Sequence, residues 1–379
     1  MIHSKTLFKV KKSYLIALLA IFCLNGVFAS SKTEGANDQA KEKEFDVNEM
    51  IMHHIKDAHE WHLWGGEHDG TTIYLPIILI DGGLKTFSSS HFYHGKVVSV
   101  IDEKTGESVE FISGVGPAEG YGMFHEKIYK LAGGTLTILD GHIHGNIKVL
   151  DFSITKNVLS LFMGALFILV IMSSVARFYK KNGAVAPKGL AKFLEPLIVM
   201  VRDDVAKSNI GEHKYKKYVP YLLTIFFFIF FNNLLGLVPI LPGGANLTGN
   251  ISVTLFLAVC TLLVTLFSSN KNYWKHIFAT PGVPAALLPI MIPIEMVGIL
   301  TKPFALMIRL FANMTAGHII VLALVSIIFI NKNVAWGALS VPMALFISVL
   351  ELLVAFLQAY LFAMLSALFI GGAVEESHH

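Results

Sequence analysis

The sequence predicts an all-α polytopic membrane protein with five crossings, an amphipathic surface helix and two long tilted C-terminal helices, preceded by a small β-rich exported domain. Of its 379 residues, 54% are hydrophobic and only 15% are charged, whereas soluble domains carry about 25% charged residues. Long apolar runs fill the second part of the chain, and short β-prone runs fill the first. This composition excludes a disordered chain, a nucleic-acid-binding protein and an ordinary cytosolic enzyme.

The distribution of charge divides the chain in the same way. Residues 30–150 carry 18 acidic and ten basic side chains, a net charge of −8. Residues 151–379 carry nine acidic and 16 basic side chains, a net charge of +7. We therefore expect an acidic domain in water at 30–150 and a membrane domain with basic loops at 151–379.

The first 29 residues have the pattern of a secretory signal. An apolar run from Tyr14 to Phe28 ends in small residues, which predicts cleavage near Ala29. Four lysines precede the run: Lys5, Lys9, Lys11 and Lys12. The alternative is a retained membrane anchor, but the run is short for a span of about 20 residues.

The exported domain is expected to be rich in β-strands. Residues 31–50 are polar and predict a loose linker, and glycine turns separate the runs that follow. The predicted strands fall at Thr71–Ile80, Lys96–Ile101, Ser108–Ile112 and Thr135–Asp140. The domain contains ten of the 16 histidines, so it is also His-rich.

The histidines of this domain leave two interpretations open. His59 and His62 are spaced to share one face of a helix and to hold a metal there. The alternative, which the sequence favours, is a polar surface, because no cysteine or fixed tetrad of ligands accompanies them. The other members of the group are His53, His54, Asp57, Glu60 and the later pair His142 and His144. We expect neither a metal nor another cofactor.

Five apolar runs are long enough to cross a membrane. They occupy residues 158–176, 219–241, 250–268, 284–330 and 338–372. The last two exceed the roughly 20 residues that span a hydrocarbon layer of about 30 Å. They must tilt strongly or lie partly in the interface.

The loops between these runs orient the protein. Residues 177–218 hold ten Lys and Arg against four acids, which predicts a cytoplasmic loop. Within it, Pro187–Lys207 alternates apolar and charged residues as an amphipathic helix on the membrane surface does. The turn at 241–249 makes the second and third spans a hairpin. An exported first domain, five crossings and a cytoplasmic C-terminus are mutually consistent.

Polar residues interrupt the last two spans. Arg309 is one of only three arginines, and a charge at the bilayer centre usually marks function because it costs roughly 2.5–3.5 kcal/mol. Glu295, Lys302 and Arg309 follow at intervals of seven, which predicts one helical stripe. Asn313 extends this stripe, and His318 faces roughly the opposite side. On the last span, Glu351 and Gln358 share a face.

Structural roles are the alternative for each of these residues. Glu295 and Lys302 have the pattern of interfacial charges whose long stems snorkel. Asn313 and Gln358 are typical of polar contacts between helices. Arg309 and Glu351 are of opposite charge and would form a structural pair, and His318 would be a satisfied interior histidine.

Three motifs closely resemble subunit a of F-type ATP synthases. The first, Ile294–His318, contains the highly specific core Arg-Leu-Phe-x-Asn-Met-x-Ala-Gly from Arg309 onward. The second, Leu357–Phe362, resembles the last helix of that family. The third, Asn233–Pro239, resembles its hairpin region. The resemblance extends from about Phe152 to the C-terminus and leaves the exported domain outside.

The resemblance implies the stator half of a rotary ion motor in a bacterial inner membrane. Two offset proton half-channels would face a ring of c subunits, and the chain itself would perform no bond chemistry. Arg309 would release the ion from the rotor, while His318 and Glu351 would line the periplasmic half-channel. Further implied partners are the b-subunit peripheral stalk, the rest of the synthase, the lipid bilayer and protons, but no nucleic acid.

Two departures from the family pattern are informative. Many bacterial members have glutamate at the position of His318 and histidine at that of Glu351. Here the two are exchanged, as in mitochondrial relatives, so the pair would relay protons with its roles swapped. Gly236 replaces an aspartate that is common in bacterial hairpins.

Three other classes of protein account for part of the sequence. A secondary transporter also contains intramembrane charge but typically shows internal repeats, and none occurs here. A structural subunit of a respiratory complex would lack the arginine stripe. A secreted histidine-rich metal-binding protein would explain the first third of the chain alone.

Overall fold

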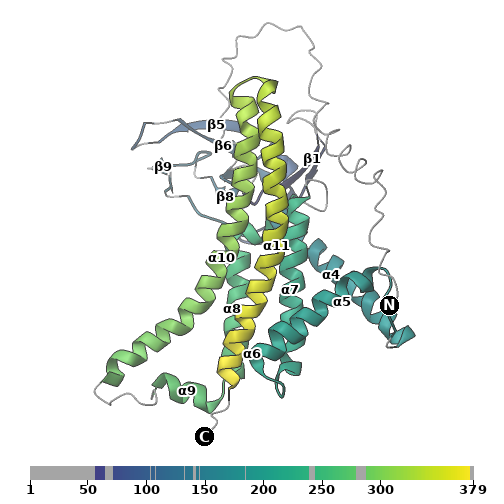
Figure 1. The fold of residues 1–379 in the computed structure, drawn as a ribbon. Coiled ribbons are helices and arrows are strands. Elements are labelled where there is room, and N and C mark those ends of the chain that lie inside the picture. The colour runs from purple at the N-terminus through teal and green to yellow at the C-terminus, as the bar shows by residue number, and fades with distance from the viewer. Residues whose placement is uncertain are drawn as a thin grey trace. The chain divides into compact units, whose positions relative to one another are not determined.

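The computed structural model describes most of the chain after Ile55 (Figure 1). The described residues are 56–64, 71–102, 104–106, 108–131, 133–139, 142–144, 146–183, 185–238, 244–278 and 287–375. The predicted signal peptide, the predicted linker at 31–50 and both His53 and His54 lie outside them. Strands fill the described part before Ser153, and long helices follow from Lys156.

The described residues before Ser153 form four small antiparallel sheets. Strand β1 pairs with β2, β9 pairs with β10, β3 lies between β11 and β4, and β5, β6, β7 and β8 follow in order. One short helix, α3 (Ser90–Tyr93), and a 3-10 turn, η1 (Gly116–Ala118), connect them. The strands are β1 (Glu60–Trp64), β2 (Thr71–Tyr74), β3 (Pro76–Ile80), β4 (Leu84–Ser88), β5 (Lys96–Ile101), β6 (Ser108–Ser113), β7 (Tyr121–Phe124), β8 (Lys127–Lys130), β9 (Ile138–Leu139), β10 (His142–Ile143) and β11 (Leu150–Asp151).

These strands bury two apolar clusters. Ile77 and Leu79 of β3 face one cluster with Phe92 and Tyr121, and Phe111 lies in the other. The predicted β-rich character is therefore confirmed. The predicted helical face for His59 and His62 is wrong: residues from Glu60 onward pair with β2, and this pairing buries Trp61.

Within the described residues, five helices are long and apolar enough to cross a membrane, as predicted. They are α4 (Lys156–Asn182), α7 (Tyr215–Leu237), α8 (Ile251–Ser268), α10 (Leu288–Ile330) and α11 (Gly337–Val374). Shorter elements join them: α5 (Leu190–Met200), the π-helical η2 (Val201–Lys207), α6 (Ser208–Ile210), η3 (Leu247–Gly249), α9 (Lys271–Phe278) and η5 (Val334–Trp336).

Helix α11 packs closely against both α7 and α10, and α8 packs against α10. Small residues recur every fourth position on the buried side of α11 and let its backbone approach its neighbours. A Cβ on Gly371 would collide with the carbonyl oxygen of Asn209 in α6. The turn between α7 and α8 is closed by the Gly244 N–H, which donates to the Leu235 carbonyl oxygen (3.3 Å). The small residues of α11 are Ala355, Ala359, Ala363, Ala367 and Gly371.

The basic segment between α4 and α7 is helical with one apolar side. Leu194, Val201 and Val205 are buried in the helical core, whereas charged side chains occupy the opposite side. Its apolar side packs against other helices of the chain. The amphipathic helix on the membrane surface stays a prediction.

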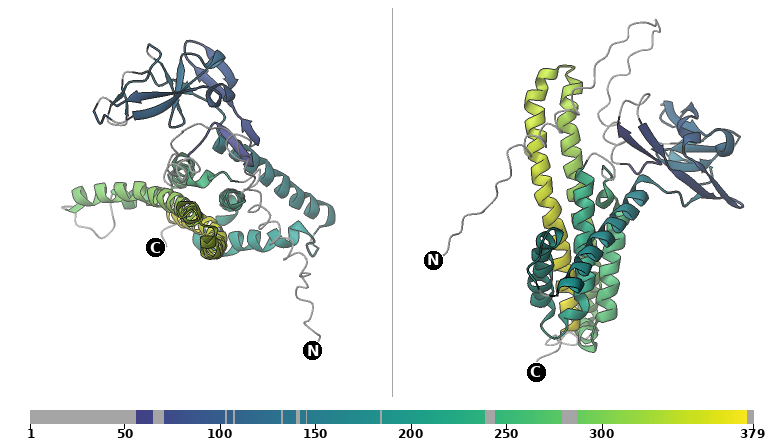
Figure 2. Two further views of the ribbon diagram at one scale, coloured as in Figure 1. Left: turned by 90° about the horizontal axis from the view of Figure 1, so that it is seen from above. Right: turned by 90° about the vertical axis from the view of Figure 1, so that its right-hand side faces the viewer.

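Helices α10 and α11 are much longer than a bilayer requires. The 43 residues of α10 extend about 64 Å at about 1.5 Å per residue. The helix contains Pro293 and Pro303, and proline bends helices because it removes one backbone hydrogen bond. Its first turns diverge from α11, as Figure 1 and the left view of Figure 2 show. The rest of α10 lies along α11.

Candidate functional site

Arg309 lies on a side of α10 that no other described element covers. Its own side chain and that of Asn313 are exposed, whereas Met307 and Met314 on the opposite side are buried. Among the described residues, no carboxylate forms an ion pair with Arg309. The alternative of a structural pair with Glu351 is therefore not supported. A permanent cation is presented outward, among exposed apolar side chains.

The predicted stripe continues toward the start of α10. Lys302 is exposed, and Glu295 is half-buried. The Lys302 ammonium lies 5.7 Å from the centre of the Phe369 ring of α11, a contact typical of a cation on an aromatic face. The spacing of seven thus places Lys302, Arg309 and Asn313 on the exposed side.

His318 lies on the inner side of α10. Its Nε2 is buried and has no hydrogen-bond partner among the described residues. A Cβ on Gly236 of α7 would lie 3.9 Å from this nitrogen, an ordinary van der Waals distance, so α7 packs beside the imidazole at this position. As predicted, His318 and Arg309 lie on different sides of α10: the Arg309 side chain is exposed, and the His318 side chain is half-buried.

Glu351 is brought to the same place from α11. A Cβ on Gly317 would collide with the Glu351 carboxylate, so this carboxylate contacts the residue immediately before His318. Both side chains are half-buried. The structure therefore places the Glu351 carboxylate against the residue next to His318 in α10, and no direct hydrogen bond or ion pair joins the two side chains among the described residues.

Gln358, two turns further along α11, is 3% exposed. Between it and Glu351, the Asn233 amide donates to the carbonyl oxygen of Ala355 (3.5 Å). The Thr248 hydroxyl donates to Asn233 Oδ1 (2.6 Å). We had not predicted these two polar residues as part of the site. The sequence pattern that could have pointed to them is Asn233 in the apolar stretch of α7. Burying an amide side chain costs free energy unless it forms hydrogen bonds.

A second polar recess lies near Lys302. Its volume is about 20 Å³, enough for roughly one water molecule. The hydroxyls of Thr261 and Thr265 in α8 and of Tyr273 in α9 belong to its lining residues. Counted along α10 at about 1.5 Å per residue, Lys302 is about 10 Å from Arg309 on one side, and His318 is about 14 Å on the other.

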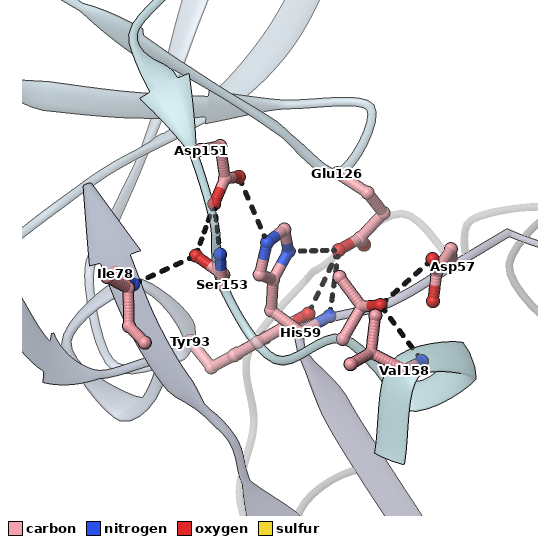
Figure 3. A network of polar contacts seen from close by, with 9 residues as sticks. Asp57, His59, Ile78, Tyr93, Glu126, Asp151, Ser153 and Val158 are labelled. Carbon is pink, nitrogen blue, oxygen red and sulfur yellow. Dashed lines mark hydrogen bonds and ion pairs between the residues drawn. The ribbon is translucent and has the colours of Figure 1, made fainter. Parts of the chain in front are cut away.

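A separate cluster joins the β-rich region to α4 (Figure 3). His59 is 2% exposed, with Nδ1 3.5 Å from Glu126 Oε2 and Nε2 3.4 Å from Asp151 Oδ2. Burial alone would lower the pKa of His59, but the two carboxylates outweigh it and raise the pKa to about 9. His59 therefore carries its proton at neutral pH.

The carboxylates of this cluster are held in place by the surrounding chain. Burial would raise the pKa of Glu126, yet the pairing with His59 holds it below its usual value. Glu126 has a positive φ of 62° in the turn between β7 and β8, where glycine or asparagine is usual. Its contacts with His59 and with the Tyr93 hydroxyl (3.2 Å) compensate for that conformation.

Next to this cluster, Asp57 fixes the start of α4. Its Oδ1 accepts from the Asn157 N–H (3.0 Å), and its Oδ2 accepts from the Thr155 hydroxyl (2.9 Å). Thr155 itself caps the helix by accepting from the Val158 N–H (3.4 Å). Among the described residues, no group of three metal ligands occurs here or elsewhere.

Comparison with known proteins supports the interpretation of the helical part. Residues 158–371 match the family described as ATP synthase A chain. The chain belongs to this family. Residues 50–152 match a second family, described only as a domain of unknown function (DUF8433).

Three relatives of the ATP synthase A chain family illustrate the similarity. The chain is 52% identical over 241 residues to ATP synthase subunit a 2 of Chlorobaculum tepidum, which covers 62% of this chain and 67% of the relative. It is 48% identical to ATP synthase subunit a of Chloroherpeton thalassium, over 60% of this chain and 69% of the relative. It is 47% identical to ATP synthase subunit a of Myxococcus xanthus, over 61% of this chain and 76% of the relative.

Membership in this family gives the role of the part of the chain that it matches, residues 158–371. A protein of the ATP synthase A chain family is the stator subunit of the membrane sector of F-type ATP synthase. It translocates protons as one component of a complex and is not the catalytic subunit. With its apolar helices, the chain is a multi-pass membrane protein.

Proposed function

We propose that this chain forms two offset proton half-channels against a ring of c subunits, with Arg309 between them. The observation that carries the proposal is the exposure of Arg309 on an uncovered side of α10, with a polar site on each side of it along the helix. Asn313 and Lys302 share this exposed side. An exposed cation on an apolar surface needs a partner that brings a negative charge.

The electrostatics explain how Arg309 would act. A rotor carboxylate in lipid is neutral because desolvation disfavours its charged form, and beside a fixed cation it ionises. Arg309 would therefore make each rotor site release its proton and would block direct flow between the half-channels. The membrane potential contributes ~2.3 kcal/mol per charge for each ~100 mV.

The two polar sites would serve opposite sides of the membrane. His318 and Glu351 would line the periplasmic half-channel, with Gln358 and Asn233 as polar groups deeper in it. Glu295 and Lys302, beside the recess at Thr265 and Tyr273, would form the cytoplasmic one. A titratable imidazole on this path favours protons over sodium ions, since histidine exchanges protons near neutral pH.

The topology completes this assignment. We place the signal peptide at 1–29, the exported domain at 30–150 and the proton-channel domain at 151–379 of a bacterial inner-membrane protein. The basic segment at 177–218 would lie in the cytoplasm, with the polar side of α5 at the membrane surface. Five crossings then put the C-terminus in the cytoplasm.

The exported domain would dock near the proton entrance. Its net charge of −8 would attract cations toward the periplasmic half-channel. A stator partner such as the peripheral stalk is a second contact that this acidic surface would suit.

The replacement Arg309→Ala tests the central proposal. We expect coupled ATP synthesis in vesicles to be abolished and membrane insertion to be retained, because the exposed guanidinium supports no described contact of the fold. The matched control is Arg177→Ala, near the end of α4, where the side chain donates to the Ser173 carbonyl oxygen of its own helix. Wild-type ATP synthesis by the Arg309 variant in an imposed proton gradient would refute the proposal.

A further inference from the structure

The sheet formed by β11, β3 and β4 has one buried and one exposed face. Paired residues of neighbouring strands point to the same face, and Leu150, Ile80 and Leu84 are directly paired across the three strands. Ile78 shares this face by alternation, and Phe152 continues it, donating its N–H to the Ile78 carbonyl oxygen (2.9 Å). We call these five residues, Ile78, Ile80, Leu84, Leu150 and Phe152, the outer face.

The outer face is apolar and uncovered by any described segment. Leu84 is 71% exposed, Leu150 is 64% exposed and Phe152 is 63% exposed. The remaining residues of β3 and β4 with the same orientation are Pro76, Thr86 and Ser88, so the face contains no charge. Contiguous exposed apolar surface of this kind marks an interaction site in soluble domains.

Charged side chains at the tip of this sheet lie on the other face. The Lys85 ammonium lies 5.0 Å from the centre of the Tyr121 ring, and Tyr121 belongs to the buried cluster. The Asp81 carboxylate accepts from the Tyr121 hydroxyl and from the Lys130 ammonium, both at 2.8 Å. The charged groups at the tip therefore make their polar contacts on the opposite face of the sheet, not on the outer face.

The outer face is continuous with the first membrane-spanning helix. Only four residues separate β11 from α4, which begins at Lys156. Hydrogen bonds fix this connection: the Ile154 N–H donates to Pro76 (3.1 Å), and the Lys156 N–H donates to Ala58 (2.9 Å). Exposed apolar side chains resume on α4 at Val158.

From this continuity we infer that the outer face lies on the lipid bilayer, with its aliphatic side chains in the interfacial layer. An uncharged face that begins within a few residues of a membrane span matches the chemistry of that layer. The inference deepens the proposed role of the exported domain near the proton entrance and rests on it. Lipid contact would hold the β-rich region at the membrane surface.

Spin-label accessibility tests this inference in the intact synthase in liposomes. Cys260, the free cysteine among the described residues, is first replaced by serine. A nitroxide is then attached to a cysteine introduced by Leu84→Cys or by Leu150→Cys. The control is Val97→Cys on β5, an aliphatic position of the same region that is 63% exposed and lies outside the outer face. Collision with oxygen, which concentrates in lipid, is compared with collision with a water-soluble nickel chelate.

We expect a several-fold higher ratio of oxygen to nickel accessibility at positions 84 and 150 than at position 97. A ratio at 84 and 150 no higher than at 97 would place the face in water. Shielding of these labels from both agents would show that a protein segment covers it. Either result overturns the inference, while the effect of Arg309→Ala on ATP synthesis tests the half-channels independently.

Discussion

At the scale of single residues, the site separates a permanent charge from groups that exchange protons. Arg309 is exposed, whereas His318 and Glu351 are half-buried on the inner side of the same helix pair. This division suits a motor in which the cation acts on the rotor and the titratable groups carry protons to it. The buried Nε2 of His318, which has no hydrogen-bond partner among the described residues, has a lone pair available for a proton or a water molecule.

His318 and Glu351 are expected to act as one relay. Glu351→Gln and His318→Ala should each slow proton flux strongly, and the double replacement should cost less than the sum, with a coupling energy of about 0.5–3 kcal/mol. Proton flux through vesicles containing each variant measures this cycle. The control is Ser348→Ala, one turn from Glu351, whose hydroxyl already donates to the Ala344 carbonyl oxygen. Strictly additive losses would count against a shared path.

His59 is expected to make the junction with α4 depend on pH. Its pKa is raised from 6.5 to about 9, so its stabilisation is complete below pH 6.5 and is lost as the pH rises through about 9. The pKa values of Glu126 and Asp151 lie below their ordinary values of 4.5 and 3.8. Their contribution is therefore present above these values and is lost as the pH falls.

The replacement His59→Gln tests this dependence. Near pH 6 it should lower the free energy of unfolding of the β-rich region by about 3 kcal/mol, because it leaves two partly buried carboxylates without their cation. The difference should shrink above pH ~9. Hydrogen exchange of β1 and β11, corrected for intrinsic rates, measures it in the intact complex. His144→Gln, at an exposed histidine, should have no comparable effect.

At the scale of elements, the close approach of α10 and α11 depends on a glycine. Gly317 leaves no room for a Cβ because the Glu351 carboxylate occupies that space. The missing side chain therefore places the carboxylate against the backbone next to His318. Two helices that are each longer than the bilayer thus meet at one defined register.

Gly317→Ala should displace Glu351 and reduce proton flux by about tenfold or more, since proton transfer depends on hydrogen-bond reach. Gly298→Ala is the matched control, because it lies in the same helix and a Cβ there would meet nothing within 4 Å. Both variants should insert and assemble. Equal proton flux in the two variants would show that the contact at Gly317 does not position the relay.

At the scale of the whole molecule, the β-rich region is attached to the membrane domain through the start of α4. Deletion of residues 31–154 retains the predicted signal and Thr155, the helix cap. We expect reduced assembly or reduced proton flux, because the deletion removes the acidic surface and the outer face together. Assembly and flux are measured separately on either side of pH ~6.5. If assembly and proton flux both stayed at wild-type values, the β-rich region would have no part in proton translocation.

Much of the architecture followed from local sequence patterns. Five apolar runs became five long helices because a span requires only length and hydropathy. The stripe at Lys302, Arg309 and Asn313 followed from helical periodicity. The helical face expected for His59 and His62 was wrong, because strand pairing with β2 depends on residues that lie outside the local window.

By itself, the sequence determined the class of protein, the number of long helices and which polar residues share a helical side. These properties depend on composition and on spacing along one element, which short-range geometry translates directly into structure. Only the tertiary structure decided that Glu351 contacts Gly317, that Asn233 and Thr248 join the same buried path, and that His59 lies between Glu126 and Asp151. Each of these contacts joins residues far apart in the chain, so its existence depends on how whole elements pack.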